Sequence, residues 1–149
     1  MSDDFDKLIQ YLQEKVLEED RKIYSEKIIA EFMNPQNFGK IENPDSWSSV
    51  KGTCGDMVEL FLSIRDDKIT DIKFSTGGCG ATVACNSYIT RIVKGKTLKE
   101  AYGVEAKDID DYLGLPEKNK HCADLAVFSL RTAIDKYYTK KKIEAELED

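Results

Sequence analysis

Three of the chain's four cysteines stand where metal ligands are commonly built. Cys54 is followed by Gly55 and Asp56, Cys79 stands between glycines, and Cys122 follows His121, the single histidine. Neighbouring glycines leave a sulfur uncrowded, and a helix N-terminus favours the thiolate, which is both the nucleophile and the metal ligand. Thiolates and imidazole suit zinc and iron–sulfur centres, whereas a carboxylate binds such centres less well. These residue types predict a metal site in which the carboxylate is the weakest ligand.

Spacing alone leaves the metal open, because the candidate ligands are scattered and form no compact motif of paired cysteines. Any single free cysteine is also often a small buried residue. Cys85 is the clearest case, since six helical residues turn it about 240° away from Cys79. We expect Cys85 in the core, and the alternative is a spare thiol that holds sulfur in transit.

Composition excludes several classes of protein. The 149 residues fit one domain, with 41% apolar and 34% charged residues. A net charge of −6 argues against nucleic-acid binding. The acidic N-terminus resembles no secretory signal, and no apolar run approaches the length of a membrane span. We therefore expect a cytoplasmic protein with no membrane and no nucleic-acid partner.

The first half of the chain is expected to hold two helices and three strands. Apolar residues recur at helical spacing over 4–20 and 25–33, and Asn34-Pro35 ends the second helix. Alternating apolar residues predict a strand over 57–65, which pairs through the turn at Asp66-Asp67 with a strand around Ile72 and Phe74. Residues 47–51 form a candidate third strand.

The second half is expected to be helical. A helix begins near Gly80, Thr97 starts a short capping-box helix that Gly103 ends, and 107–113 form another turn of helix. The last helix begins at His121 or Cys122 and ends near 138. The sequence thus predicts an α+β fold: a small antiparallel sheet of about three strands, helices on one face, and an N-terminal amphipathic helix. We expect the chain to divide into an N-terminal helical extension at 1–23, a domain at 24–138 and a charged helical tail at 139–149.

Three short motifs, in this order, resemble the signatures of the NifU-like/IscU-like iron–sulfur scaffold family. They are Cys54-Gly55-Asp56, Gly78-Cys79-Gly80 and His121-Cys122. The resemblance extends to the run from Tyr24-Ser25-Glu26-Lys27 through Asn34-Pro35-Gln36-Asn37-Phe38-Gly39, to Lys94-Gly95-Lys96-Thr97 and to Leu115-Pro116. It covers about residues 24–138 and makes the α+β fold the expected one.

This resemblance implies a scaffold and carrier rather than an enzyme. Such a protein receives sulfur from a cysteine desulfurase and iron from a separate donor, assembles a transient [2Fe–2S] cluster and passes it to apo-proteins. Cys54, Cys79 and Cys122 are the implied cluster ligands and sulfur acceptors, Asp56 keeps the cluster labile, and His121 is an alternative ligand. Zinc is a further implied occupant of the same site.

Two alternatives remain at this point. A zinc-dependent sulfurtransferase would hold Zn²⁺ on Cys54, Asp56, Cys79 and Cys122 and accept persulfide sulfur. A structural zinc module fits less well, because such sites are normally closed tetrahedra of Cys and His.

Two segments bear on the partners. Leu115-Pro116-Glu117-Lys118-Asn119 stands where many family members have Leu-Pro-Pro-Val-Lys, which places recognition by a dedicated Hsp70-type chaperone in doubt. The N-terminal extension has an apolar stripe that must be buried somewhere. We expect it to pack on its own domain or on a second copy, as in a homodimer; its residues are Phe5, Leu8, Ile9, Leu12 and Val16.

Overall fold

Two helices, three strands and a group of further helices follow one another along the chain. The computed structural model describes residues 2–53 and 55–148. The first half contains α1 (Ser2–Ile23), α2 (Glu26–Met33), β1 (Ser46–Lys51), β2 (Met57–Arg65) and β3 (Lys68–Thr76). The second half contains α3 (Gly80–Val93), α4 (Leu98–Tyr102), α5 (Ala106–Leu113), a single 3₁₀ turn at Glu117–Asn119 and α6 (Lys120–Glu148).

The sheet is antiparallel in the order β1-β2-β3, and its register places apolar residues opposite one another. Leu60 faces Phe74 and Leu62 faces Ile72 across the β2–β3 pair. Asp66 and Asp67 join these strands with φ values of 53° and 60°. Positive φ at both central residues matches the tight hairpin turn whose twist fits the flanking strands, and Asp tolerates this conformation better than most residues.

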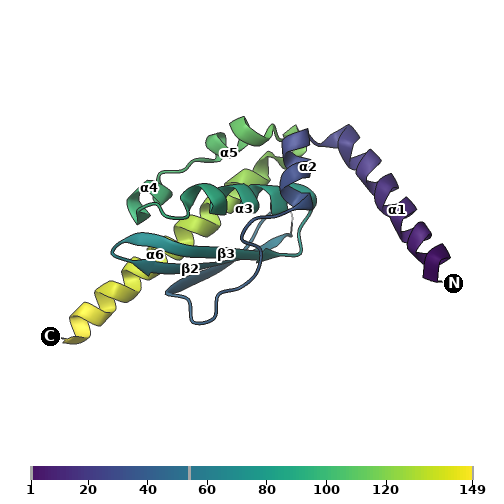
Figure 1. The fold of residues 1–149 in the computed structure, drawn as a ribbon. Helices are drawn as coiled ribbons and strands as arrows, with labels where there is room; N and C mark the ends of the chain where they lie inside the picture. Colours follow the sequence, from purple (N-terminus) through teal and green to yellow (C-terminus); the bar gives the residue numbers. More distant parts are fainter. Residues whose placement is uncertain (1, 54, 149) are drawn as a thin grey trace.

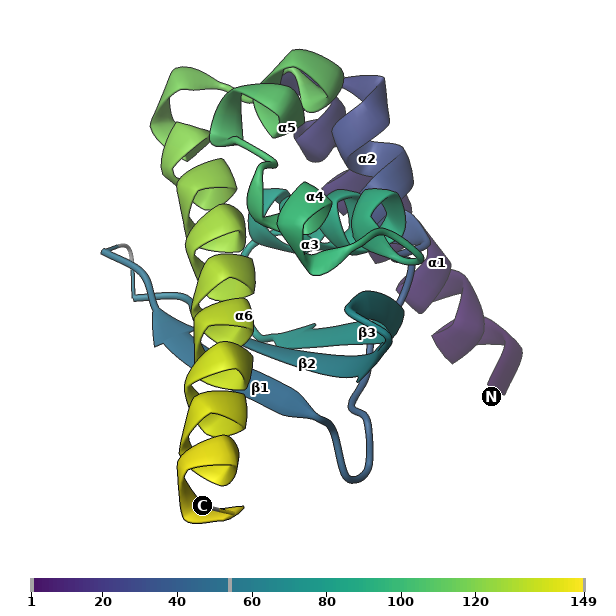
Figure 2. The same ribbon diagram turned by 90° about the vertical axis from the view of Figure 1, so that its left-hand side faces the viewer.

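The helices cover one face of this sheet (Figures 1 and 2). In Figure 2, α6 runs across the strands while α3, α4 and α5 lie beside it. Two serines let α6 approach β1 closely: the buried hydroxyls of Ser46 and Ser48 donate to the carbonyls of Ala133 and Ser129, at 2.6 and 2.8 Å. The core between sheet and helices contains Leu60, Leu62, Ile72, Ala84, Ile89, Ala126, Leu130 and Ile134.

The α+β prediction is confirmed, with one boundary that differs clearly. The capping box at Thr97 is present, with both of its hydrogen bonds to and from Glu100. The last helix, however, continues to Glu148 instead of ending near 138. Its charged end is supported by pairs one turn apart, such as Lys141 with Glu144 at 3.8 Å. The predicted tail is therefore a continuation of α6.

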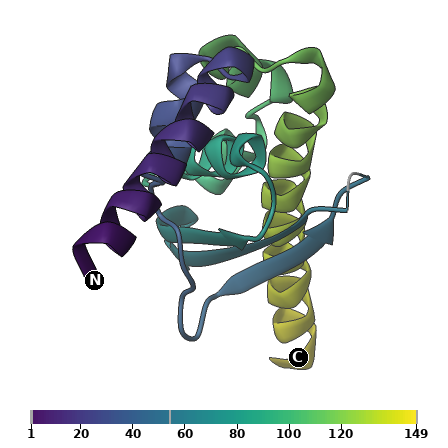
Figure 3. The same ribbon diagram turned by 90° about the vertical axis from the view of Figure 1, so that its right-hand side faces the viewer.

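Helix α1 projects away from the rest of the molecule, as Figures 1 and 3 show. Most of its apolar stripe stays exposed instead of packing on the domain, with Phe5 64% exposed and Val16 60%; the alternative, association with a second copy, stays a prediction. Where α1 approaches α2, a groove of about 620 Å³ opens, and its apolar lining comprises Ile9, Leu12, Val16, Phe32 and Met33.

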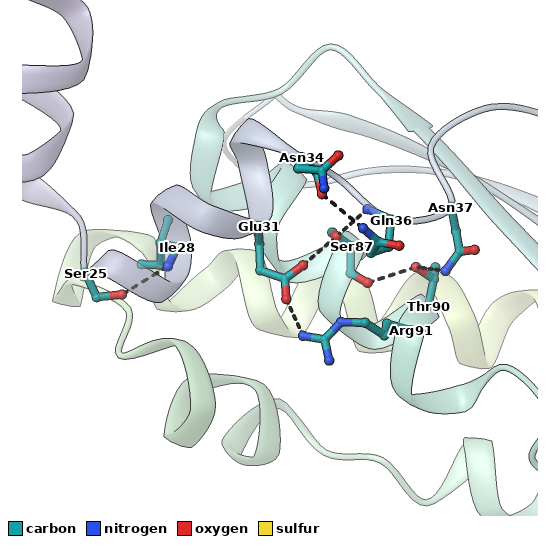
Figure 4. A network of polar contacts seen from close by, with 9 residues as sticks. All are labelled: Ser25, Ile28, Glu31, Asn34, Gln36, Asn37, Ser87, Thr90 and Arg91. Atoms are coloured by element: carbon teal, nitrogen blue, oxygen red, sulfur yellow. Dashed lines mark hydrogen bonds and ion pairs between the residues drawn. The ribbon is translucent and has the colours of Figure 1, made fainter. Parts of the chain in front are cut away.

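A polar network fastens α2 to α3 (Figure 4). Glu31, on α2, accepts from the hydroxyl of Ser87 at 2.6 Å and pairs with Arg91. The Ser87 hydroxyl also accepts from the backbone N–H of Gln36 at 2.8 Å, and Asn37 donates to Thr90 at 3.3 Å. The start of the domain is thereby held on the helix that follows Cys79. Among the described helices, none has a stretch apolar and long enough to cross a bilayer.

Candidate functional site

Asp56 reaches the site from the connection between β1 and β2. A tight turn brings it there: the backbone N–H of Gly52 donates to the Asp56 carbonyl at 2.8 Å, and Gly55 adopts φ 90°. The carboxylate then lies against the backbone of Gly78. A Cβ at Gly78 would stand 2.7 Å from Oδ2 of Asp56, so only glycine leaves room for this approach.

Cys79 is exposed and occupies the N-cap position of α3. A hydrogen bond from the Cys122 thiol lowers the pKa of Cys79 most, and the N–H groups of Thr82 and Ala81 lower it further, against the opposite effect of burial. This is the expected behaviour of a sulfur at a helix N-terminus, where free N–H groups point at it. Cys79 is therefore the thiol that ionises first in this pair.

Cys122 lies in the first turn of α6 and is fully buried. Its hydrogen bond to the Cys79 sulfur raises the pKa of Cys122, and burial raises it further. The half-buried ring of His121 lies beside it, with Nε2 at 3.7 Å from the Cys122 sulfur. The two sulfurs thus have different roles in the metal-free chain: Cys79 accepts the hydrogen bond and Cys122 donates it.

Thr82 stands between these groups. It is fully buried in the first turn of α3, and its hydroxyl donates to Oδ2 of Asp56 at 2.8 Å. The same oxygen lies 3.3 Å from the Cys122 sulfur and 3.6 Å from the Cys79 sulfur. One hydroxyl therefore contacts groups from the β1–β2 connection, α3 and α6.

The structure brings Asp56, Cys79, His121 and Cys122 together, and the fifth predicted ligand, Cys54, lies outside the described residues. Within the described chain, which lacks position 54, no three His, Cys, Asp or Glu residues are arranged to hold a metal ion. The Thr82 hydroxyl lies between the Asp56 carboxylate and the sulfur of Cys122. The assignment of these residues as ligands remains a prediction.

Cys85 lies apart from this cluster. It is fully buried in the core, and burial raises the pKa of its thiol. A neutral buried thiol is a poor nucleophile and a poor ligand. The geometry therefore supports the expected core position.

Sequence reasoning missed two residues of the site, Thr82 and Gly78. Thr82 follows Cys79 by three residues, which places both on one side of the first helical turn. That spacing was a usable signal. The closeness of Gly78 to Asp56 has no such signal, because Asp56 lies in the β1–β2 connection and Gly78 in the connection between β3 and α3.

An open groove of about 670 Å³ adjoins the site on the side of His121. Its lining combines apolar and charged side chains from the end of β1, the start of α5 and α6: Lys51, Glu105, His121, Leu125, Phe128 and Arg131. Of the candidate ligands, His121 lines this groove, so the groove meets the site at the start of α6.

Comparison with known proteins gives consistent matches. The model of the NifU-like N terminal domain family matches residues 23–144. The chain is 41% identical to the iron–sulfur cluster assembly scaffold protein IscU 1 of Archaeoglobus fulgidus, over 79% of this chain and 78% of the relative. It is 39% identical to the scaffold protein IscU of Escherichia coli K12, over 80% of this chain and 97% of that protein.

A solved structure gives the same result for the fold. It is described as a candidate iron–sulfur cluster assembly scaffold of the SUF system from Fervidobacterium islandicum, and it is 26% identical with a TM-score of 0.64. The alignment covers 76% of this chain and 97% of that one. With the family model spanning most of the sequence, the chain belongs to the NifU-like N terminal domain family.

Proposed function

We propose that this chain is a scaffold on which iron–sulfur clusters are assembled before they pass to apo-proteins. The convergence of Asp56, Cys79 and Cys122 around Thr82 is the observation that carries the proposal. Two soft thiolates and one hard carboxylate, from three separate segments, suit a cluster that must assemble on the chain and later be released from it. The relatives named as assembly scaffolds support the same function.

The cargo in this proposal is a [2Fe–2S] cluster built from iron and sulfide. Cys54, Asp56, Cys79 and Cys122 are the proposed ligands, with His121 as the alternative, and zinc occupies the same site when iron is absent. This ligand set fits, because thiolates bind iron–sulfur centres well while one carboxylate leaves a labile position.

The partners in this proposal are a cysteine desulfurase, an iron donor and apo-proteins. The exposed, readily ionised Cys79 is the proposed first sulfur acceptor. Its thiolate attacks the outer sulfur of the desulfurase persulfide, the new S–S bond forms on Cys79, and the desulfurase cysteine leaves as a thiolate. The chain acts as a carrier in the cytoplasm, and residues 24–138 form the assembly domain.

The zinc-dependent sulfurtransferase alternative is not favoured, because the relatives are named for scaffolding. Both readings share Cys79 as the sulfur acceptor. They differ in whether iron and sulfide are retained together on the chain.

Anaerobic reconstitution with ferrous iron and sulfide tests the proposal. We expect visible absorption from a cluster, with iron and acid-labile sulfide in equal amounts. Cys79→Ala should lose this cluster, whereas the matched variant Cys85→Ala, on the same helix but in the core, should retain it. Wild-type chain that binds zinc but never retains iron with sulfide would refute the scaffold function.

A further inference from the structure

The Thr82 hydroxyl has one proton and three acceptors within reach. The Asp56 carboxylate is closest at 2.8 Å, and the sulfurs of Cys122 and Cys79 lie at 3.3 and 3.6 Å. A hydroxyl donates a single hydrogen bond at a time, and a charged oxygen is a stronger acceptor than sulfur. In the metal-free chain the Thr82 hydroxyl therefore donates its hydrogen bond to the Asp56 carboxylate.

Among the described residues, the Thr82 hydroxyl is the side-chain donor to the Asp56 carboxylate. Its carboxylate is packed against the backbone of Gly78, at a distance that excludes a side chain there. Thr82 is fully buried in the first turn of α3, so its hydroxyl oxygen stays beside the carboxylate while the hydroxyl hydrogen can still turn toward another acceptor. A metal ion that binds Asp56 through Oδ2 competes with the Thr82 hydroxyl for that oxygen.

We propose that Thr82 is a positioning residue that competes with the metal for Asp56. Its hydroxyl holds the carboxylate while the site is empty, releases it when a metal binds, and then donates to a neighbouring sulfur. Since the sulfur is the weaker acceptor, this exchange costs free energy, so Thr82 weakens the retention of metal. This inference rests on the proposed site, and it assigns the lability of the site to the pair of residues rather than to Asp56 alone.

Zinc binding to the chelator-treated chain, measured by competition with a chromophoric chelator, tests the inference. Thr82→Val keeps the size of the side chain but removes the hydroxyl, and it should bind Zn²⁺ roughly tenfold more tightly, the scale of one lost hydrogen bond to a charged group. Thr82→Ser should restore wild-type affinity. Thr90→Val is the matched control, because Thr90 is an equally buried threonine on α3 away from the site.

A double variant separates the proposed route from others. In an Asp56→Ala background, Thr82→Val should leave zinc affinity unchanged, because the carboxylate for which the hydroxyl and the metal compete is absent. An unchanged or weaker affinity of Thr82→Val in the wild-type background would overturn the inference. So would a gain that persists without Asp56, which would place the effect on the sulfurs. Thr82→Ala takes the place of the valine variant if that variant melts much earlier than wild type.

The two proposals fail independently in these experiments. A chain that assembles a cluster but shows no Asp56-dependent effect of Thr82 refutes the inference alone. A chain that shows the zinc effect but assembles no cluster refutes the scaffold function alone.

Discussion

Cys79 and Cys122 form one hydrogen-bonded pair, yet they differ in exposure and in ionisation. Cys79 is exposed at the start of α3, while Cys122 is buried at the start of α6. The shared hydrogen bond lowers the pKa of Cys79 and raises that of Cys122. Because only the thiolate reacts with alkylating reagents, the two sulfurs should differ in their reactivity with pH.

Alkylation of the reduced, metal-free chain measures this difference. A lowered pKa means that Cys79 is already a thiolate at pH values where an ordinary thiol, with a pKa of about 8.5, is protonated. We expect iodoacetamide to modify Cys79 first, as read by peptide mass spectrometry. The rate of modification should rise with pH and reach its plateau at a lower pH than for an ordinary thiol. Cys122→Ala should shift the Cys79 profile toward higher pH, because it removes the main donor.

Unfolding in urea provides the control for this prediction, since it should make the cysteines alike. A Cys79 profile in the folded chain that coincides with the unfolded one would contradict the proposed pairing of the two sulfurs.

Asp56 should determine how long a cluster stays on the chain. It is the hardest of the proposed ligands, and a weakly held position is the one where we expect water or a recipient protein to enter. We expect Asp56→Ala to hold a reconstituted cluster several-fold longer, followed by the decay of visible absorption under anaerobic conditions. Asp124→Ala is a suitable control, because Asp124 is an exposed carboxylate on α6 near His121. Faster decay in Asp56→Ala would show that the carboxylate stabilises the cluster.

At the scale of elements, the apolar stripe of α1 stays largely exposed in the described part of the chain, apart from the approach of α1 to α2. Its exposed residues recur every three or four positions, which gives a continuous apolar seam along one side: Phe5, Ile9, Leu12 and Val16. Most helical stability in proteins comes from packing of an apolar face, so an exposed seam of this kind favours association.

Deleting residues 1–20 tests the role of this helix. We expect sedimentation to show fewer chains per assembly, that is, a mass lower by more than the deleted residues. The melting temperature should change little, because α1 contributes little packing to the domain. Cluster reconstitution should persist. Replacing Lys7 and Lys15, which lie off the seam, by Ala should leave the mass unchanged. Loss of reconstitution with unchanged mass would show instead that α1 docks an assembly partner.

The elements differ in how well the sequence predicts them. The β2–β3 hairpin follows from strict alternation and from the two aspartates that tolerate positive φ. The tail at 139–149 was predicted to be helical, but its continuity with α6 was missed because most of its residues are charged and only Ile143 and Leu147 extend the apolar spacing. Thr82 was missed because a neutral threonine has no ligand chemistry of its own, and its contact with Asp56 joins segments that only the fold brings together.

For the whole molecule, stability depends on how the N-terminal part of the domain is attached to the sheet and α3. The network around Glu31 and Ser87 makes this connection (Figure 4). Ser87 is fully buried, donates to Glu31 and accepts from the Gln36 backbone. Ser87→Ala would leave both partners short of a hydrogen bond inside the protein.

We expect Ser87→Ala to lower the free energy of unfolding by about 1–3 kcal/mol, the cost of unsatisfied buried groups. Urea unfolding followed by circular dichroism would measure it. Ser49→Ala, on the exposed side of β1, should change the free energy by less than about 0.5 kcal/mol. Equal unfolding midpoints for the two variants would show that the network adds no stability.

The outer edge of β3 has a consequence for the protein in storage and in the cell. Its Phe74 backbone exchanges hydrogen bonds with Asn37 and Gly39, and its Ile69 backbone does so with Gly95 and Lys96. Between them, the N–H of Ile72 donates to the carboxylate of Asp71 at 2.9 Å. An open strand edge is a template on which further strands add and from which aggregates grow. With these groups already engaged, this edge leaves few free backbone groups for the strand of another chain to pair with.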